Sequence, residues 1–326
     1  MGQSVVLTDP ATGSTAEVAV DQGFNCFRFS VVAGDRTIEV IDAPTDFASG
    51  SHRPSSHGIP VLFPFPNRIR DGRFHWQGVD YEIPESVGLR DPDGNAIHGF
   101  CIDLPWRVIR QEANFVTGEF QLSRDAPSRR DSWPADFILQ LTWSLEAGET
   151  GGALLRSDFR ISNPGETPLP WGLGTHPYFR LPLAEGSTAA DCLVEAPATE
   201  AWSLVNCLPT GERTPVPASA DLRRSPRLGE LQLDDVLTGL PSDKPVESRL
   251  MDPVAGLEVV QQSDPLFREL VVYTPGGRDA VCIEPYTCVT DAIRLEADGI
   301  DTGLQVLRPG AEATTWITIS AGPVLA

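Results

Sequence analysis

Two residues that can exchange protons stand in the same short sequence format. His176 in THPYF and Glu284 in IEPYT each precede a proline that is followed by a tyrosine. Proline pushes the residue before it into extended backbone, so both side chains should be held with little freedom. An imidazole and a carboxylate fixed in this way form a workable general acid and general base. The same format also marks ordinary strand ends, and by itself it leaves both interpretations open.

A further histidine lies in the stretch DPDGNAIHGF. The start of this stretch is similar to a calcium-binding loop, but its glycine stands at the fourth position and Ile102 at the twelfth, where glutamate is needed. We therefore reject calcium binding. Gly99 lets the backbone bend just after His98, and the spacing alone favours a solvated turn histidine.

The segment GIPVLFPFPNRI carries Asn67 and Arg68 near its end, just before Ile69. Pro64 and Pro66 cannot donate to a β-ladder, so the segment is predicted to be an edge strand or an irregular one. Such a stiff segment can present both side chains to a cleft, where the guanidinium donors suit clustered ligand oxygens. An ordinary surface arginine is the alternative.

Three other side chains have two possible uses each. Asp234 and Asp235 in LQLDDVLT can cap a helix or bind ligand hydroxyls, and capping is the commoner use. Cys282 should share a strand face with Glu284, because alternate residues of a strand point the same way. An active thiol is conceivable there, while a buried and inert cysteine is more frequent.

The elements that must position these residues are predicted to be strands. Short runs rich in β-branched and aromatic residues recur along the chain, and FILQLTWSL alternates polar and apolar residues as a strand with one buried face does. The stretch RIRDGRFHWQGVDYEI carries two turn signals, Asp71-Gly72 and Gln77-Gly78, of which aspartate-glycine is a strong hairpin signal. The best helix candidate, ADLRRSPRLGELQLDD, is interrupted by Pro226 and Gly229. The sequence predicts a mainly β protein, with residues 1–326 forming one large antiparallel β-sandwich domain.

The composition excludes several classes of function. A formal charge of −20 argues against nucleic acid and against an anionic membrane surface as partners. Lys244 is the sole lysine and lies in a turn-like stretch, so Schiff-base chemistry is disfavoured. We find no basic and apolar leader, no apolar run of about 20 residues, no phosphate-binding or dinucleotide motif and no CxxC pair. Six scattered cysteines are best explained as free thiols in a reducing cytoplasm.

Taken in order, the stretches GIPVLFPFPNRIRDGRF, NAIHGF, PWGLGTHPYFRLP, LDDVLT and CIEPYT resemble the aldose 1-epimerase (galactose mutarotase) family. They extend from about Gly58 to Thr287, whereas the first ~57 residues give no firm match. The resemblance implies a galactose-mutarotase-like β-sandwich. It also implies a cofactor-free and metal-free enzyme that interconverts the α and β anomers of a monosaccharide. The sequence indicates neither the particular sugar nor the oligomeric state.

The same resemblance assigns roles to individual residues. Glu284 is implied as the catalytic base and His176 as the acid. The implied sugar-binding residues are Arg68, His98, Asn67, and Asp234 in preference to Asp235.

Other functions stay open at this point. A related branch of the fold acts on hexose 6-phosphates, and the arginines of RDAPSRRDSWPADF together with Arg68, Arg70 and Arg73 would suit a phosphate. A non-catalytic sugar-binding or sugar-sensing module is a second alternative. A metalloenzyme that uses His98, His176 and Glu284 is a third, although no short ligand spacing supports it. A glycosidase would need two opposed carboxylates.

Overall fold

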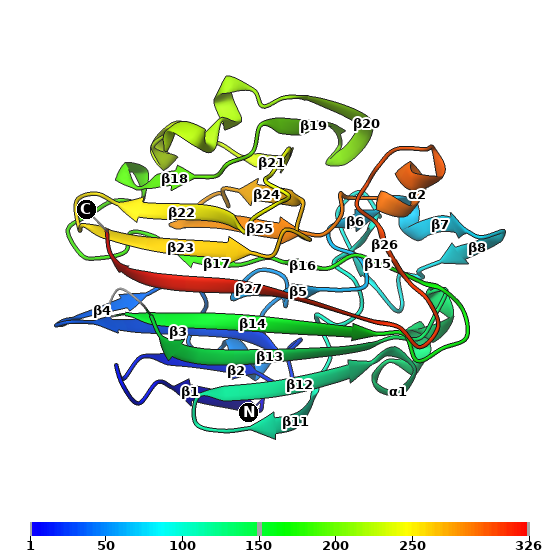
Figure 1. The fold of residues 1–326 in the computed structure, drawn as a ribbon, viewed down its shortest axis with the longest axis horizontal. Helices are drawn as coiled ribbons and strands as arrows, with labels where there is room; N and C mark the ends of the chain where they lie inside the picture. Colours follow the sequence, from blue (N-terminus) through cyan, green and yellow to red (C-terminus); the bar gives the residue numbers. More distant parts are fainter. Residues whose placement is uncertain (1, 149–151, 325–326) are drawn as a thin grey trace.

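The computed structural model describes residues 2–148 and 152–324, and antiparallel sheets dominate it (Figure 1). The short β-branched and aromatic runs that the sequence marks as strand-like contribute to strands, as FILQLTWSL does. The first sheet has the order β1-β2-β3-β4. Its strands are β1 (Ser4–Thr8), β2 (Thr15–Ala19), β3 (Asn25–Ala33) and β4 (Arg36–Glu39).

The longest strands form one eight-stranded sheet with the order β11-β12-β13-β14-β27-β23-β22-β18. Their bounds are β11 (Arg107–Gln111), β12 (Phe115–Gln121), β13 (Ile138–Ala147), β14 (Ala153–Ser162), β27 (Glu312–Pro323), β23 (Leu257–Ser263), β22 (Val246–Asp252) and β18 (Leu193–Glu195). The alternation in FILQLTWSL is realised in β13, where Leu139, Leu141, Trp143 and Leu145 are buried and the residues between them are partly exposed.

A second large sheet has the order β20-β19-β21-β24-β25-β16-β5, and β17 also pairs with β25. Its strands are β20 (Leu208–Pro215), β19 (Glu200–Val205), β21 (Asp234–Thr238), β24 (Glu269–Tyr273), β25 (Ala280–Tyr286), β16 (Gly174–Thr175), β5 (Val61–Leu62) and β17 (Tyr178–Arg180). The proline-rich segment thus provides β5, which ends the order of this sheet as an edge strand should.

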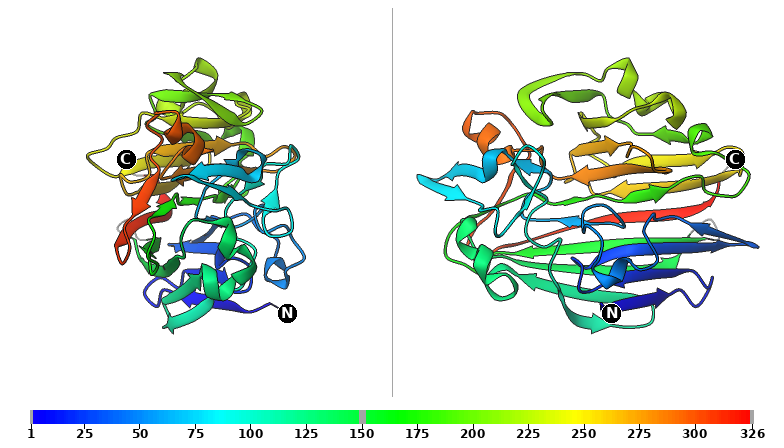
Figure 2. Two further views of the ribbon diagram at one scale, coloured as in Figure 1. Left: turned by 90° about the vertical axis from the view of Figure 1, so that its right-hand side faces the viewer. Right: turned by 180° about the vertical axis from the view of Figure 1, so that it is seen from behind.

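The two large sheets pack against each other as a sandwich. Val281 and Ile283 on one face of β25 belong to the same hydrophobic cluster as Ile317 and Ile319 of β27. The side chain of Gln261 on β23 donates a hydrogen bond to the carbonyl oxygen of Ile283, at 3.1 Å. In Figures 1 and 2, the strands of both sheets run in roughly the same direction across the molecule, as in aligned sheet packing.

Small sheets and short helices complete the fold. The small sheets are β6 (Arg68–Ile69), β10 (Ala96–Ile97) and β9 (Leu89–Arg90); β15 (Leu169–Trp171) and β26 (Gln305–Leu307); and β7 (Arg73–Trp76) and β8 (Val79–Glu82). The α-helices are α1 (Leu122–Asp125) and α2 (Ala292–Ala297). The 3-10 helices are η1 (Phe47–Ser49), η2 (Arg70–Gly72), η3 (Pro127–Ser132), η4 (Ala189–Asp191), η5 (Ala218–Ala220), η6 (Leu222–Arg224) and η7 (Leu228–Glu230). Within residues 2–148 and 152–324, no helix is long and apolar enough to cross a membrane.

The two turn signals of the sequence have different outcomes. Gln77-Gly78 forms the hairpin between β7 and β8, with positive φ at both residues. Asp71-Gly72 also takes positive φ at both residues, but the prediction of a hairpin there is wrong. β6 pairs with β10 instead of with β7, so the turn only redirects the chain.

Candidate active site

The centre of the site lies on β25, in the interior of the second large sheet. Val281 and Ile283 face the sandwich core, so Cys282, Glu284 and Tyr286 project from the opposite face. The Glu284 side chain is 2% exposed. Burial raises the pKa of Glu284 well above its usual value, and a hydrogen bond donated by the Tyr286 hydroxyl opposes that rise.

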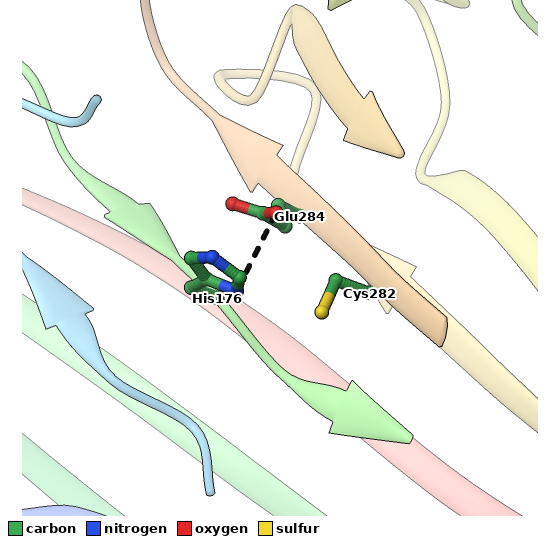
Figure 3. A group of neighbouring side chains, drawn as sticks. All are labelled: His176, Cys282 and Glu284. Atoms are coloured by element: carbon green, nitrogen blue, oxygen red, sulfur yellow. Dashed lines mark ion pairs between the residues drawn. The ribbon is translucent and has the colours of Figure 1, made fainter. Parts of the chain in front are cut away.

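His176 reaches the same place from the segment between β16 and β17. Its Nδ1 atom lies 3.4 Å from Oε1 of Glu284, the contact drawn as a dashed line in Figure 3. The backbone N–H donates to the carbonyl of Pro60, at 3.0 Å, and the Tyr178 ring stacks on the imidazole with centroids 4.6 Å apart. Burial lowers the pKa of His176 to about 3, so the free imidazole is neutral at pH 7.

The two pKa shifts act on neighbouring buried groups and have the same cause. Burial raises the pKa of the carboxyl and lowers the pKa of the imidazole, so both shifts favour the neutral forms, a protonated Glu284 beside an uncharged His176. Transfer of this proton to His176 would give a carboxylate beside an imidazolium. The pair therefore contains one proton donor and one proton acceptor in either arrangement.

Asn67, Arg68 and His98 come together at one side of this pair. The Arg68 guanidinium donates to Asp91 Oδ2 and to Asn67 Oδ1, both at 2.7 Å. The His98 backbone N–H donates to the carbonyl of Asn67, also at 2.7 Å, and the His98 ring meets the His176 ring edge-on at 5.6 Å. His98 is 7% exposed, so the interpretation as a solvated turn histidine is wrong.

Backbone conformation explains how the segments that carry Asn67 and His98 turn toward His176 and Glu284. Asn67 and His98 both adopt left-handed backbone, with φ of 53° and 67°. Gly99 follows His98, and a Cβ atom there would lie 2.1 Å from the carbonyl oxygen of Phe63. Only glycine permits this close approach. The approach holds the backbone that carries His98 beside β5 and Phe63 of the proline-rich segment.

The sheet register separates the two aspartates of LDD. Asp234 pairs with Tyr273, which in turn pairs with Cys282, so Asp234 lies on the same face as Glu284. Asp235 pairs with Val272 and points to the opposite face, where burial raises its pKa. The structure thus places Asp234, and not Asp235, on the face of the sheet that carries the acid/base pair.

Several of the arginines that suggest a phosphate site are paired with carboxylates. Arg70 lies 3.8 Å from Asp291, Arg73 lies 3.2 Å from Glu82 on the β7–β8 hairpin, and Arg129 lies 2.6 Å from Asp103. These three guanidinium groups therefore already have carboxylate partners within the protein, where a phosphate would otherwise bind them.

Other residues at the site carry little or no signal in the sequence. The Arg278 guanidinium lies over the Tyr178 ring, 4.6 Å from its centroid, and bonds the carbonyl of Ser56. Cys207, at the tip of the β19–β20 hairpin, brings its sulfur within 3.9 Å of the Asp234 carboxylate. Tyr286 is signalled by its place in IEPYT and by strand alternation, since it stands two residues after Glu284.

His176, Cys282 and Glu284 have the residue types of a metal site. Their ligand atoms lie within 4.8 Å of one another, and imidazole, thiolate and carboxylate are all zinc ligands. Burial raises the pKa of the Cys282 thiol well above its usual value, whereas the thiolate is the form that binds metal. A metal-free site stays a prediction.

A second buried acid occupies the same face of the sheet beyond Tyr286. Glu269 pairs with Tyr286 across β24 and β25, is fully buried, and accepts a 2.8 Å hydrogen bond from the Trp202 indole. Burial raises the pKa of Glu269 to about 7. The native protein therefore binds this proton more tightly than the unfolded chain does.

We expect Glu269→Gln to change the pH dependence of stability. The stabilisation from protonated Glu269 is complete below pH 4.5 and is lost as pH rises through about 7, at a cost of up to roughly 3 kcal/mol. Glutamine lacks this titration, so urea unfolding should show the variant gaining stability over the wild type between pH 5 and pH 8. An equal change in both proteins over that range would contradict the prediction.

The fold and the site can now be compared with known proteins. The sequence matches the aldose 1-epimerase family over residues 30–320, and the chain belongs to that family. The uncharacterized protein YihR of Escherichia coli is 25% identical over 76% of this chain and 74% of its own length. The galactose mutarotase of Rattus norvegicus is 29% identical, over 50% of this chain and 44% of its own length.

Solved structures show the same fold. A galactose mutarotase-like protein from Clostridium acetobutylicum has a TM-score of 0.79 and 21% identity, over 96% of this chain and 94% of its own. A GalM/aldose epimerase homologue from C. elegans has a TM-score of 0.80 and 18% identity over the whole of both chains. The predicted galactose-mutarotase-like β-sandwich is confirmed, and the family match begins within the first 57 residues, which the motifs do not reach.

Proposed function

We propose that the protein is an aldose 1-epimerase that interconverts the α and β anomers of a hexose such as glucose or galactose, without a cofactor. The observation that carries this proposal is the contact between His176 and Glu284, 3.4 Å apart on one buried face of a sheet. Membership of the aldose 1-epimerase family supports an isomerase that acts on sugars. Residues 1–326 as one domain and a cytoplasmic location belong to the same proposal, and all six cysteines are unpaired.

Exchange of anomers requires two proton transfers. In the proposed mechanism, Glu284 removes the proton from the C1 hydroxyl while His176 delivers one to the ring oxygen, and the ring opens. The C1 carbonyl then rotates, the ring closes on its other face, and the two groups exchange roles. The one proton that the pair shares is sufficient for this cycle, because the sugar returns the proton that it receives.

The surrounding side chains would hold the sugar while these transfers occur. We assign hydroxyl binding to Arg68, His98, Asn67 and Asp234. Asp91 and Asn67 fix the Arg68 guanidinium before a ligand arrives, which reduces the entropy that is lost on binding. A sugar fixed in this way keeps C1 and the ring oxygen aligned with the acid/base pair.

A neutral sugar is favoured over a hexose 6-phosphate. Arg70 and Arg73 are paired with carboxylates, and the face of Glu284 also carries Asp234. A phosphate dianion would meet the negative charge of that aspartate.

Anomer-resolved NMR tests the proposal directly. Freshly dissolved α-glucose, α-galactose and their 6-phosphates are mixed with catalytic amounts of protein, and the growth of the β-anomer signal is followed. We expect faster equilibration of at least one free hexose than in buffer, with the phosphate esters slower. Saturable sugar binding by calorimetry without any acceleration would instead identify a non-catalytic binding protein.

A further inference from the structure

Tyr286 makes the most direct contact with the carboxylate of Glu284. It follows Glu284 by two residues on β25, so both side chains leave the strand on the same face. Its hydroxyl donates a hydrogen bond to Oε2 of Glu284, while Oε1 is the atom that faces His176. The two carboxylate oxygens are therefore occupied by different partners on different sides.

The Tyr286 ring is closely packed in the interior of the protein, and Gly174 leaves the space that the ring needs. The side chain is fully buried among apolar residues that include Val236, Val271 and Cys288. Gly174 pairs with Tyr286 across β16 and β25, and a Cβ atom on Gly174 would lie 2.4 Å from the ring. This second glycine of WGLG thus makes room for the ring, whose position then fixes where the hydroxyl points.

We propose that Tyr286 is a positioning residue for Glu284. Its hydroxyl holds Oε2, directs Oε1 toward His176 and the sugar, and favours the ionised carboxylate that takes the C1 proton. This inference rests on the proposed epimerase function.

The hydrogen bond from Tyr286 matters because burial and a neighbouring charge raise the pKa of the Glu284 carboxyl. Burial raises the pKa of Glu284, and the negative charge of Asp234 raises it further. The Tyr286 hydrogen bond and the positive charge of Arg68 lower that pKa. Burial also raises the pKa of Tyr286 itself, so its hydroxyl stays protonated and remains a donor. The ionisable groups that face Glu284 from its own strand and from the neighbouring segments are His176, Cys282, Asp234, Arg68, Tyr178 and Tyr273.

Tyr286→Phe tests the proposal, since it removes the hydroxyl and keeps the aromatic ring packed in the same position. Loss of a hydrogen bond to a charged group should raise the pKa of Glu284 by about one to two units. We expect the acidic limb of the kcat profile to move to higher pH by that amount and kcat at pH 7 to fall about 10- to 100-fold. KM should change little, because Tyr286 does not touch the sugar. Tyr81→Phe on the β7–β8 hairpin is the matched control and should behave as wild type.

Two further measurements separate this inference from the function on which it rests. Gly174→Ala should displace the Tyr286 ring and also move the acidic limb of the kcat profile to higher pH. This variant leaves Tyr286 and Glu284 themselves unchanged. Titration of ¹³C-labelled glutamate carboxyls by NMR, with the Glu284 signal identified by its loss in Glu284→Gln, reports the hydrogen bond in the absence of any sugar. An active wild type whose pH profile and Glu284 titration are unchanged by Tyr286→Phe would overturn the inference. A wild type that accelerates no anomer exchange would overturn the proposed function, while the NMR titration would still decide the role of the hydroxyl.

Discussion

Replacement of Glu284 by glutamine should reduce the acceleration of anomer exchange by about 10²–10⁴-fold, the usual contribution of a well-placed acid/base group. Glutamine has nearly the same shape as glutamate, and its amide oxygen can still accept the hydrogen bond from Tyr286. It cannot take a proton from the C1 hydroxyl. Because burial raises the pKa of Glu284, the pocket already tolerates a neutral side chain. The variant should therefore unfold at the same temperature as the wild type or at a higher one.

Polarimetry on freshly dissolved α-glucose or α-galactose measures this loss, and circular dichroism with thermal unfolding reports the fold. Glu85→Gln, which alters an exposed glutamate near β8, is the matched control and should keep full activity. Full activity of a folded Glu284→Gln protein would mean that another group is the base.

Replacement of His176 by asparagine should also reduce the rate by about 10²–10⁴-fold, because an amide cannot accept and release a proton near pH 7. We expect this effect mainly on kcat. His98→Asn should differ, since we assign His98 to hydroxyl binding, and its main effect should be a raised KM.

Initial rates of anomer exchange over a range of sugar concentrations separate the two parameters. His75→Asn is the control for both variants, because this histidine lies on the exposed β7–β8 hairpin. The assignment of roles fails if the His176 variant retains its kcat, or if the His98 variant loses kcat with an unchanged KM.

The strands could be predicted from the sequence because each carries its own periodic pattern. The alternation in β13 records which face is buried, and the same rule places Cys282 and Tyr286 on the side of Glu284. The prolines after His176 and Glu284 indicate extended backbone, which Glu284 has within β25, whereas His176 lies between β16 and β17. The local format that the two residues share, however, contains no information about which strands become neighbours, so the 3.4 Å contact between the two side chains could not be obtained from it.

Features that depend on pairing between distant segments could not be predicted from the sequence pattern. The turn at Asp71-Gly72 has the local chemistry of a hairpin, but the partner of β6 lies near residue 96. The family resemblance favours Asp234 over Asp235, but only the register between β21 and β24 shows that Asp234 lies on the Glu284 face. Arg278 belongs to the surroundings of His176 because the chain after β24 returns there, and no motif marks it.

The segment that carries His98 also closes one edge of the second large sheet. β5 at that edge has two residues, and Phe63 just after it accepts a hydrogen bond from the backbone N–H of Phe100, at 2.7 Å. Short edge strands, flanking prolines and a covering segment are the means by which proteins prevent strands of other molecules from adding to a sheet. His98, which is proposed to bind the sugar, therefore lies on a segment that also protects the protein against aggregation. Loosening this segment would endanger solubility together with activity.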